Sequence, residues 1–242
     1  MIQKIKSVLL VLTVVLATTA EAQTEQQKSL DLRQESIIRI AGLTAQGNLT
    51  VLTRELEKGL EAGLTVNEIK EVLIHVYAYA GFSRSLRGLQ TFITVLDDRK
   101  EKGITDVIGA EASEIKDERT KYTRGKAVLE TLSGVPEKEP KTGYAAFAPT
   151  IEVFLKEHLF ADIFERDVLT YQERELVTIS ILTGIGGVEP MLRSHLNLSL
   201  NVGLTPAQLQ QFVEVIKTAI GKNEAKIAHV VLEEVLASRN NK

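Results

Sequence analysis

Apolar residues recur at intervals of three and four positions along most of the chain. This spacing places side chains on one face of a helix, whereas a strand would alternate apolar and polar residues. The pattern therefore predicts an all-α protein whose helices each bury one face. Three such sets are Leu49, Leu52, Leu56 and Leu60; Ile69, Val72, Leu73 and Val76; and Leu86, Leu89, Ile93 and Leu96.

The helical pattern occurs twice. Residues 35–90 align with residues 175–230 without a gap at a fixed offset of 140. Two generic helical hairpins that share capping residues are the alternative explanation, but the gapless alignment favours two copies of one unit. The identical pairs are Glu35/Glu175, Gly47/Gly187, Leu52/Leu192, Leu56/Leu196, Leu60/Leu200, Gly63/Gly203, Leu64/Leu204, Thr65/Thr205 and Gly81/Gly221.

The two copies and the composition of the segment between them predict how the chain is organised. A unit of this size buries only a limited core, so we expect the copies to pack together as a pseudo-dimer. Glycines, charges and the run GVPEKEPKTG indicate a linker, with a short helix from Asp117 to Leu132. The predicted regions are a signal peptide (1–22), a first helical repeat (23–102), a linker with a short helix (103–143) and a second helical repeat (144–242).

The first residues resemble a secretory signal peptide. Lys4 and Lys6 precede an apolar run that is too short to span a membrane, and Ala20-Glu21-Ala22 forms a small-x-small cleavage site. A retained anchor is the less favoured alternative. We expect cleavage before Gln23 and a periplasmic or secreted protein with no membrane span after cleavage.

Composition excludes several function classes. The formal net charge of -3 and the absence of basic clusters argue against nucleic acid as a partner. The chain contains no cysteine, so disulfides, thiolate metal sites and thiol redox chemistry are excluded. Its four histidines show no H-x-x-x-H spacing, so we expect no metal site.

The stretch VYAYAGFSRSLRGLQ at 76–90 predicts a corner between two helices. Gly81 ends one helix, Ser83 caps the next, and Tyr77, Tyr79 and Arg84 are candidates for the mouth of a pocket. Arg84 offers a planar fork for a carboxylate. The competing interpretation, that Tyr79 packs in the core and Arg84 is solvated, is equally consistent with the pattern.

His195 is the leading candidate for acid-base chemistry. It lies one turn after Leu192 and one turn before Ser199, at the border of a buried face. A core-edge histidine with a satisfied hydrogen bond is the alternative. His75, near the aromatic corner, is more typical of a paired interior histidine, although it too is a candidate lining residue.

Several strings resemble the carboxymuconolactone decarboxylase family. They are FAPTIEVFLKEHLFADIFERDVLTYQERELVTISIL, then HLNLSLNVGLT, and YAYAGF followed by SRSL. The resemblance implies an all-helical unit, assembly as a homotrimer with a pseudo-hexameric arrangement, and roles for His195 and Glu175. A related branch uses Cys-x-x-Cys, but Val188 and Met191 stand at those positions, so thiol peroxidase activity is excluded.

The implied function is a cofactor-free decarboxylase or lactone-transforming enzyme acting on a small carboxylated compound. His195 would supply the proton, Glu175 would orient it, and Arg84 would hold a substrate carboxylate. A non-catalytic exported scaffold of the same fold is the alternative. The chain departs from the family pattern where Ser83 replaces a proline and where Glu55 occupies the first-copy position of His195.

Overall fold

The structure, a computed structural model, describes residues 29–240. The predicted signal peptide and its cleavage site lie outside these residues. The described chain is helical and contains no β-strand between residues 29 and 240. None of its helices is long and apolar enough to cross a membrane. The prediction of an all-α fold is confirmed.

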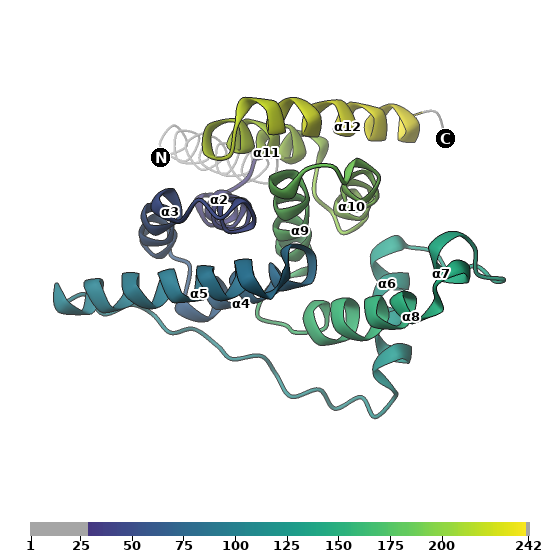
Figure 1. Ribbon diagram of the computed structural model, residues 1–242, viewed down its shortest axis with the longest axis horizontal. Helices are drawn as coiled ribbons and strands as arrows, with labels where there is room; N and C mark the ends of the chain where they lie inside the picture. The colour runs from purple at the N-terminus through teal and green to yellow at the C-terminus, as the bar shows by residue number, and fades with distance from the viewer. Residues whose placement is uncertain (1–28, 241–242) are drawn as a thin grey trace, which may run out of the picture.

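Four helices of the first half recur in the second half (Figure 1). Because α3 and α10 begin and end at the offset of 140 found in the sequence, the two copies share both their pattern and their helix boundaries. The helices of the first half are α2 (Leu32–Gln46), α3 (Leu49–Glu61), α4 (Val66–His75) and α5 (Tyr77–Glu101). Those of the second half are α9 (Tyr171–Ile185), α10 (Glu189–Asn201), α11 (Pro206–Ala219) and α12 (Lys222–Asn240).

Capping chemistry explains why the helices begin where they do. Thr65 accepts a hydrogen bond from the N–H of Glu68 at the start of α4, and Thr205 does the same with Gln208 at the start of α11. In both cases the third helical residue bonds back to the capping residue, which satisfies two N–H groups that the helix leaves free. Thr170 and Glu173 form the same motif at α9, as the sequence predicts.

The two halves share one hydrophobic core, in which α2 lies against α9. Glycine permits this close approach, because a Cβ atom on Gly184 of α9 would lie 2.9 Å from the carbonyl oxygen of Gly42 of α2. The side chains of Ile38 and Ile181, among others in these helices, are fully buried. The expected pseudo-dimer is therefore one folded body with the α2–α9 pair at its centre.

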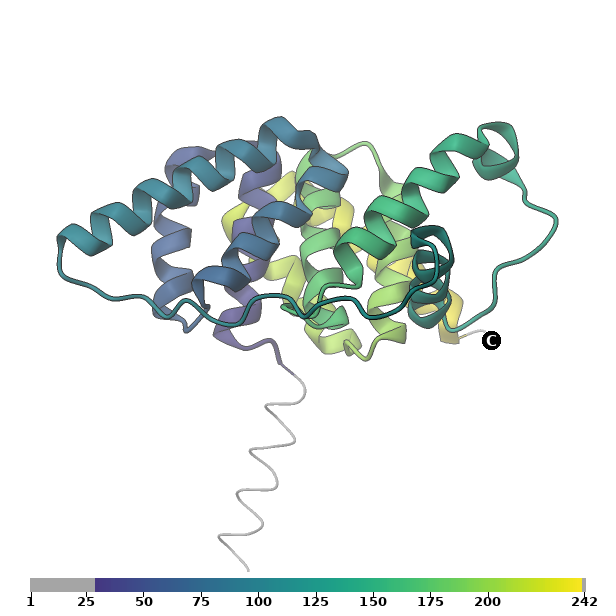
Figure 2. The same ribbon diagram turned by 90° about the horizontal axis from the view of Figure 1, so that it is seen from below.

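Residues 121–164, which cover part of the predicted linker and the start of the predicted second repeat, form a small helical subdomain at one end (Figure 2). Its helices are α6 (Lys121–Ser133), α7 (Gly143–Phe147), α8 (Pro149–Phe154) and the π-helix η1 (Leu155–Phe164). A second apolar cluster joins α6 to η1 through Val128, Leu132, Leu159, Phe160 and Phe164. The short linker helix that the sequence predicts is thus α6, which packs against η1.

The residues before α6 run in extended form along the molecule. Val66 and Asn67 at the start of α4 donate backbone hydrogen bonds to the carbonyls of Val107 and Ile108, at 2.9 Å each. Further along, the N–H of Ser113 donates to Asp167 at 2.8 Å. These contacts tie the extended segment to both halves.

The predicted corner at Gly81 differs in detail from the structure. Helix α4 ends earlier, at His75, and α5 already begins at Tyr77. Gly81, at φ 79° and ψ 164°, has a non-helical backbone and separates the first turn of α5, at Tyr77 to Ala80, from the rest of the helix, so the predicted break at Gly81 is confirmed. Helix α5 carries no side-chain cap at its start. Glycine tolerates this left-handed backbone without strain. The kink therefore lies inside α5, after the two tyrosines.

Candidate functional site

A buried carboxylate-imidazole pair occupies the adjacent helices α9 and α10. Glu175 is fully buried, and its Oε2 atom lies 2.9 Å from Nδ1 of His195. Because an ionised carboxylate only accepts hydrogen bonds, Nδ1 of His195 carries the proton and Nε2 is directed away from Glu175. His195 is 8% exposed. The structure therefore brings together the two residues that the sequence suggested as an acid-base pair.

Tyr79 completes this cluster from the other half of the chain. Its hydroxyl lies 3.2 Å from Nε2 of His195, and the two rings meet edge to face at 5.7 Å. When Nδ1 carries the single ring proton, Nε2 of His195 accepts the hydrogen bond that the Tyr79 hydroxyl donates. The result is a chain of hydrogen bonds, Glu175–His195–Tyr79, that crosses between the two copies.

His75 lies behind Tyr79 and is fully buried. Its ring stacks on Tyr79 at 5.8 Å and meets Phe164 of η1 at 5.1 Å. The hydroxyl of Thr178 donates to the carbonyl of Arg174 at 2.9 Å, so Nε2 of His75, 3.1 Å away, is the donor to Thr178. Its Nδ1 atom has no partner within the described residues.

Burial and charge fix the protonation of the two first-half groups. Burial raises the pKa of Tyr79 well above its usual value, and the negative charge of Glu175 adds to the effect. Burial lowers the pKa of His75 well below 6.5, and the positive charge of Arg174, together with that of His195 in its protonated form, acts in the same direction. Tyr79 is therefore a neutral hydroxyl and His75 a neutral imidazole at neutral pH.

An ion-pair network next to the cluster joins α4 to α9. Arg174 is fully buried and donates to Glu71 at 3.0 Å, and Arg166 donates to the same carboxylate at 2.9 Å. Burial alone would raise the pKa of Glu71, but the hydrogen bonds from Arg166 and Arg174 outweigh it and lower the pKa. Because Arg174 precedes Glu175 in the chain, this pair fixes the helix that carries the candidate acid-base group.

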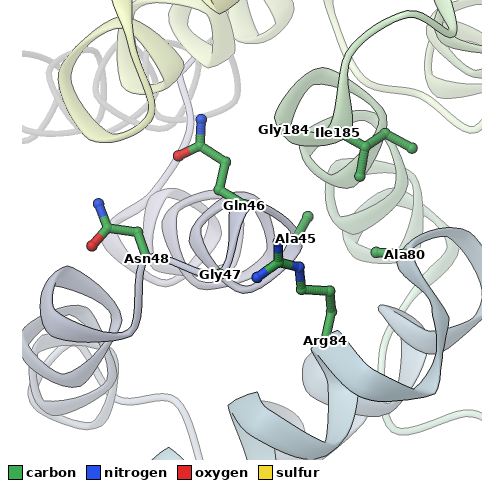
Figure 3. Close-up of a pocket in the computed structure, with 8 residues that line it drawn as sticks. All are labelled: Ala45, Gln46, Gly47, Asn48, Ala80, Arg84, Gly184 and Ile185. Atoms are coloured by element: carbon green, nitrogen blue, oxygen red, sulfur yellow. The ribbon is translucent and has the colours of Figure 1, made fainter.

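Arg84 and Tyr77, also predicted as binding residues, lie apart from His195. Tyr77 stacks on Phe82 at 4.7 Å. Arg84 is exposed and lines a separate cavity of about 590 Å³ between α2, α5 and α9 (Figure 3). Neither His195, Glu175 nor Tyr79 is among the residues that line this cavity. The predicted pocket mouth is thus divided into two places on either side of the α5 kink.

Sequence reasoning missed Thr178, Glu71 and Arg174. All three are buried polar residues of helices whose apolar pattern was read only for packing. Glu71 and Arg174 carry charges, and a charged side chain is rarely buried without a partner, but the sequence does not show that these two lie together. Thr178 is uncharged and carries no such signal. Among residues 29–240, no group of three or more potential ligands is arranged to hold a metal ion.

Comparison with known proteins identifies the family. The profile of the carboxymuconolactone decarboxylase family matches residues 12–92 and again residues 149–233, which is more than half of the chain. The chain therefore belongs to the carboxymuconolactone decarboxylase family and carries two copies of its unit. It is also similar to an uncharacterized protein of Methanocaldococcus jannaschii, with 28% identity over 72 residues, which is 30% of this chain and 67% of that protein.

Proposed function

We propose that the protein is a cofactor-free decarboxylase or lactone-transforming enzyme that acts on a small carboxylated compound. The observation that carries the proposal is the hydrogen-bonded series Glu175–His195–Tyr79, in which a fully buried carboxylate orients an imidazole toward a neutral hydroxyl. Arrangements of this type deliver or accept protons in acid-base catalysis. Family membership supports the same class of chemistry.

The proposed reaction needs an electron sink and a proton donor. The bond between the substrate carbon and its carboxylate breaks, carbon dioxide leaves, and the electron pair passes onto the carbonyl oxygen of the substrate as an enolate. The proton donor is His195 with a second proton on Nε2, taken from solvent before the reaction. The substrate carbon accepts that proton, through or beside the Tyr79 hydroxyl, and His195 is left with the Nδ1 proton that Glu175 holds. Solvent then returns a proton to Nε2, and Glu175 fixes the orientation of the ring throughout.

A competing function, a non-catalytic scaffold, is favoured by one specific observation. Both ring nitrogens of His195 have protein partners, Glu175 on one side and Tyr79 on the other. A cluster closed in this way also serves as a purely structural network between the two halves. The two functions differ in whether the Tyr79 hydroxyl yields its place to a substrate.

Release of carbon dioxide tests the proposal. Purified protein is incubated with carboxymuconolactone and a panel of small carboxylated lactones, and carbon dioxide is measured for the wild type, His195→Gln and Glu55→Gln. Since positioned acids contribute about 10² to 10⁴ in rate, His195→Gln is expected to lose at least about 100-fold in kcat. Glu55→Gln, at the equivalent position of the first copy, is the matched control and retains activity.

Two outcomes contradict the proposal, one for the activity and one for the role of His195. No carbon dioxide from any compound of the panel, together with a loss of thermal stability in His195→Gln, supports the scaffold. Turnover that persists in His195→Gln removes His195 from the proposed role. The circular dichroism spectrum of each variant shows whether the helical fold is intact.

We also propose that the chain is exported and forms a homotrimer with a pseudo-hexameric arrangement. Helix α5 exposes Phe82, Leu86 and Ile93 on one face, and apolar patches of this kind are typical of association surfaces. Light scattering of the purified protein measures the assembly, and a monomeric mass contradicts it. The intact mass of the protein recovered outside the cytoplasm shows whether it has been cleaved before Gln23.

A further inference from the structure

The cavity at Arg84 is built from both halves of the chain and is distinct from the His195 cluster. Its wall consists of the end of α2 and the turn into α3, the first turns of α5 and the end of α9 (Figure 3). The eight lining residues are Ala45, Gln46, Gly47, Asn48, Ala80, Arg84, Gly184 and Ile185. Its volume of about 590 Å³ is sufficient for a small organic molecule.

Arg84 supplies the charge of this cavity. Its guanidinium reaches from α5 to Gly47, where an added Cβ atom would lie 1.5 Å from Nη1. The absence of a side chain at Gly47, which also adopts a left-handed backbone at φ 76°, makes room for the guanidinium. Within the described residues Arg84 forms no ion pair, whereas its neighbour Arg87 donates to Gln90 at 2.8 Å.

The remaining polar groups of the wall are neutral amides. Asn48 uses its Oδ1 atom to cap α3, where it accepts from the N–H of Val51 at 3.4 Å, so its amide nitrogen is left as a donor. Gln46 carries a second amide, and it follows the last apolar residue of α2. None of the eight lining residues is acidic. The wall therefore presents one full positive charge and additional donors to whatever enters it.

We propose that this cavity binds a small carboxylate, with Arg84 as the charged anchor. A planar guanidinium matches the two oxygens of a carboxylate in a bidentate fork, and amide donors complete its hydrogen bonds. A single cation balances one negative charge, which favours a carboxylate over a phosphate dianion. The proposed binding site is separate from the site of the proposed reaction, because His195, Glu175 and Tyr79 do not line this cavity.

Nuclear magnetic resonance of the ¹⁵N-labelled protein tests the site, with butyrate, a monocarboxylate, and inorganic phosphate titrated separately at constant ionic strength. Butyrate is expected to shift the amide signals of Gly47, Asn48 and Gly184 in a saturable manner. Arg84→Gln is expected to raise the Kd for butyrate at least tenfold, and Arg84→Lys is expected to raise it less. Arg87→Gln, three residues along the same helix, is the matched control and leaves the Kd unchanged.

The possible results separate this site from the alternatives. Equal weakening by Arg84→Gln and Arg87→Gln, or shifts spread over unrelated lysines and arginines, overturns the proposal in favour of general anion attraction. Saturable binding of phosphate but not butyrate overturns the assignment to carboxylates. A loss of thermal stability in Arg84→Gln, with no binding by the wild type, overturns the proposal and means that Arg84 stabilises the end of α2 instead. The same titration on His195→Gln is expected to give the wild-type Kd, so this site and the proposed reaction fail independently.

Discussion

The His195 cluster has a counterpart in the first half of the chain, and the two regions use the same backbone positions differently. At the offset of 140, Glu175 corresponds to Glu35 and His195 to Glu55, while Tyr79 corresponds to Ala219. The second-half carboxylate is fully buried against an imidazole, whereas the Glu35 side chain is 25% exposed. One unit has thus been built into two different environments.

The first-half region is an ion-pair network rather than an imidazole site. Arg39 lies 3.5 Å from Glu35 and 3.9 Å from Glu55, and Lys58 lies 2.7 Å from Glu55. Gln211, from the second half, donates to Glu35 at 2.9 Å. Each carboxylate therefore has donors, but no side chain with a pKa near neutrality takes part. The comparison shows that the two copies differ at these positions, with an imidazole and a phenol hydroxyl in one cluster and Glu55 and Ala219 at the equivalent positions.

The largest difference between the two regions is expected in the cost of breaking an ion pair. In Glu71→Gln, the buried guanidinium of Arg174 loses its carboxylate, and we expect the free energy of unfolding to fall by about 3 kcal/mol or more. In Glu35→Gln, the partly exposed pair with Arg39 is lost, and we expect at most about 1 kcal/mol. Urea denaturation measures both values.

A double variant shows whether the cost comes from the unpaired charge. Arg174→Met combined with Glu71→Gln removes both members of the pair and is expected to recover part of the stability lost in Glu71→Gln alone. Equal losses in Glu71→Gln and Glu35→Gln would contradict the distinction between a buried and a partly exposed network.

His75, which packs against Tyr79 in the His195 cluster, is expected to make the stability of the protein depend on pH. Val215, the residue at the equivalent position of the second copy, cannot do so because it does not titrate. Because the folded-state pKa of His75 lies well below 6.5, the unfolded chain binds a proton first as the pH falls. The free energy of unfolding therefore has its full value above pH 6.5 and decreases below it, until the folded-state pKa is reached. The expected slope is about 1.4 kcal/mol per pH unit for this one proton.

Urea denaturation at several pH values below 6.5 measures this slope. His75→Gln is expected to flatten it, and His158→Gln is the control because the His158 side chain is 54% exposed. Identical slopes in the wild type and in His75→Gln would show that another group causes the dependence.

Much of this arrangement was predictable from local pattern. Thr65 and Glu68, like Thr170 and Glu173, stand three residues apart in the sequence as a capping box requires, and both boxes are present in the structure. The pairing of Glu175 with His195 was expected from the family resemblance alone, and the structure places the two side chains 2.9 Å apart. Local pattern is informative here because helix boundaries and hairpin contacts depend on residues near one another in the chain.

Contacts between the halves were not predictable in the same way. The bond between Tyr79 and His195 joins residues 116 positions apart, and that between Glu71 and Arg174 joins residues 103 positions apart. Both bonds depend on how the two halves pack together. The close approach of α2 and α9 at Gly42 and Gly184 is one part of that packing. The grouping of Arg84 with His195 was expected from sequence nearness to Tyr79, but the Gly81 kink directs Arg84 to a different cavity.

The smallest expected effect comes from removing the hydroxyl of Tyr79, whose equivalent in the second copy, Ala219, has no hydroxyl. Tyr79→Phe keeps the ring between His75 and His195 and removes only the donor to Nε2 of His195. We expect a loss of about 1 kcal/mol in the free energy of unfolding, the usual net value of one hydrogen bond. Tyr77→Phe, whose ring stacks on Phe82 away from the cluster, is the matched control and is expected to have no effect. The ¹⁵N signals of the His195 ring give a second measurement, in which the Nε2 signal moves and the Nδ1 signal, held by Glu175, remains. An unchanged Nε2 signal in Tyr79→Phe would mean that the two halves are joined by packing alone at this point.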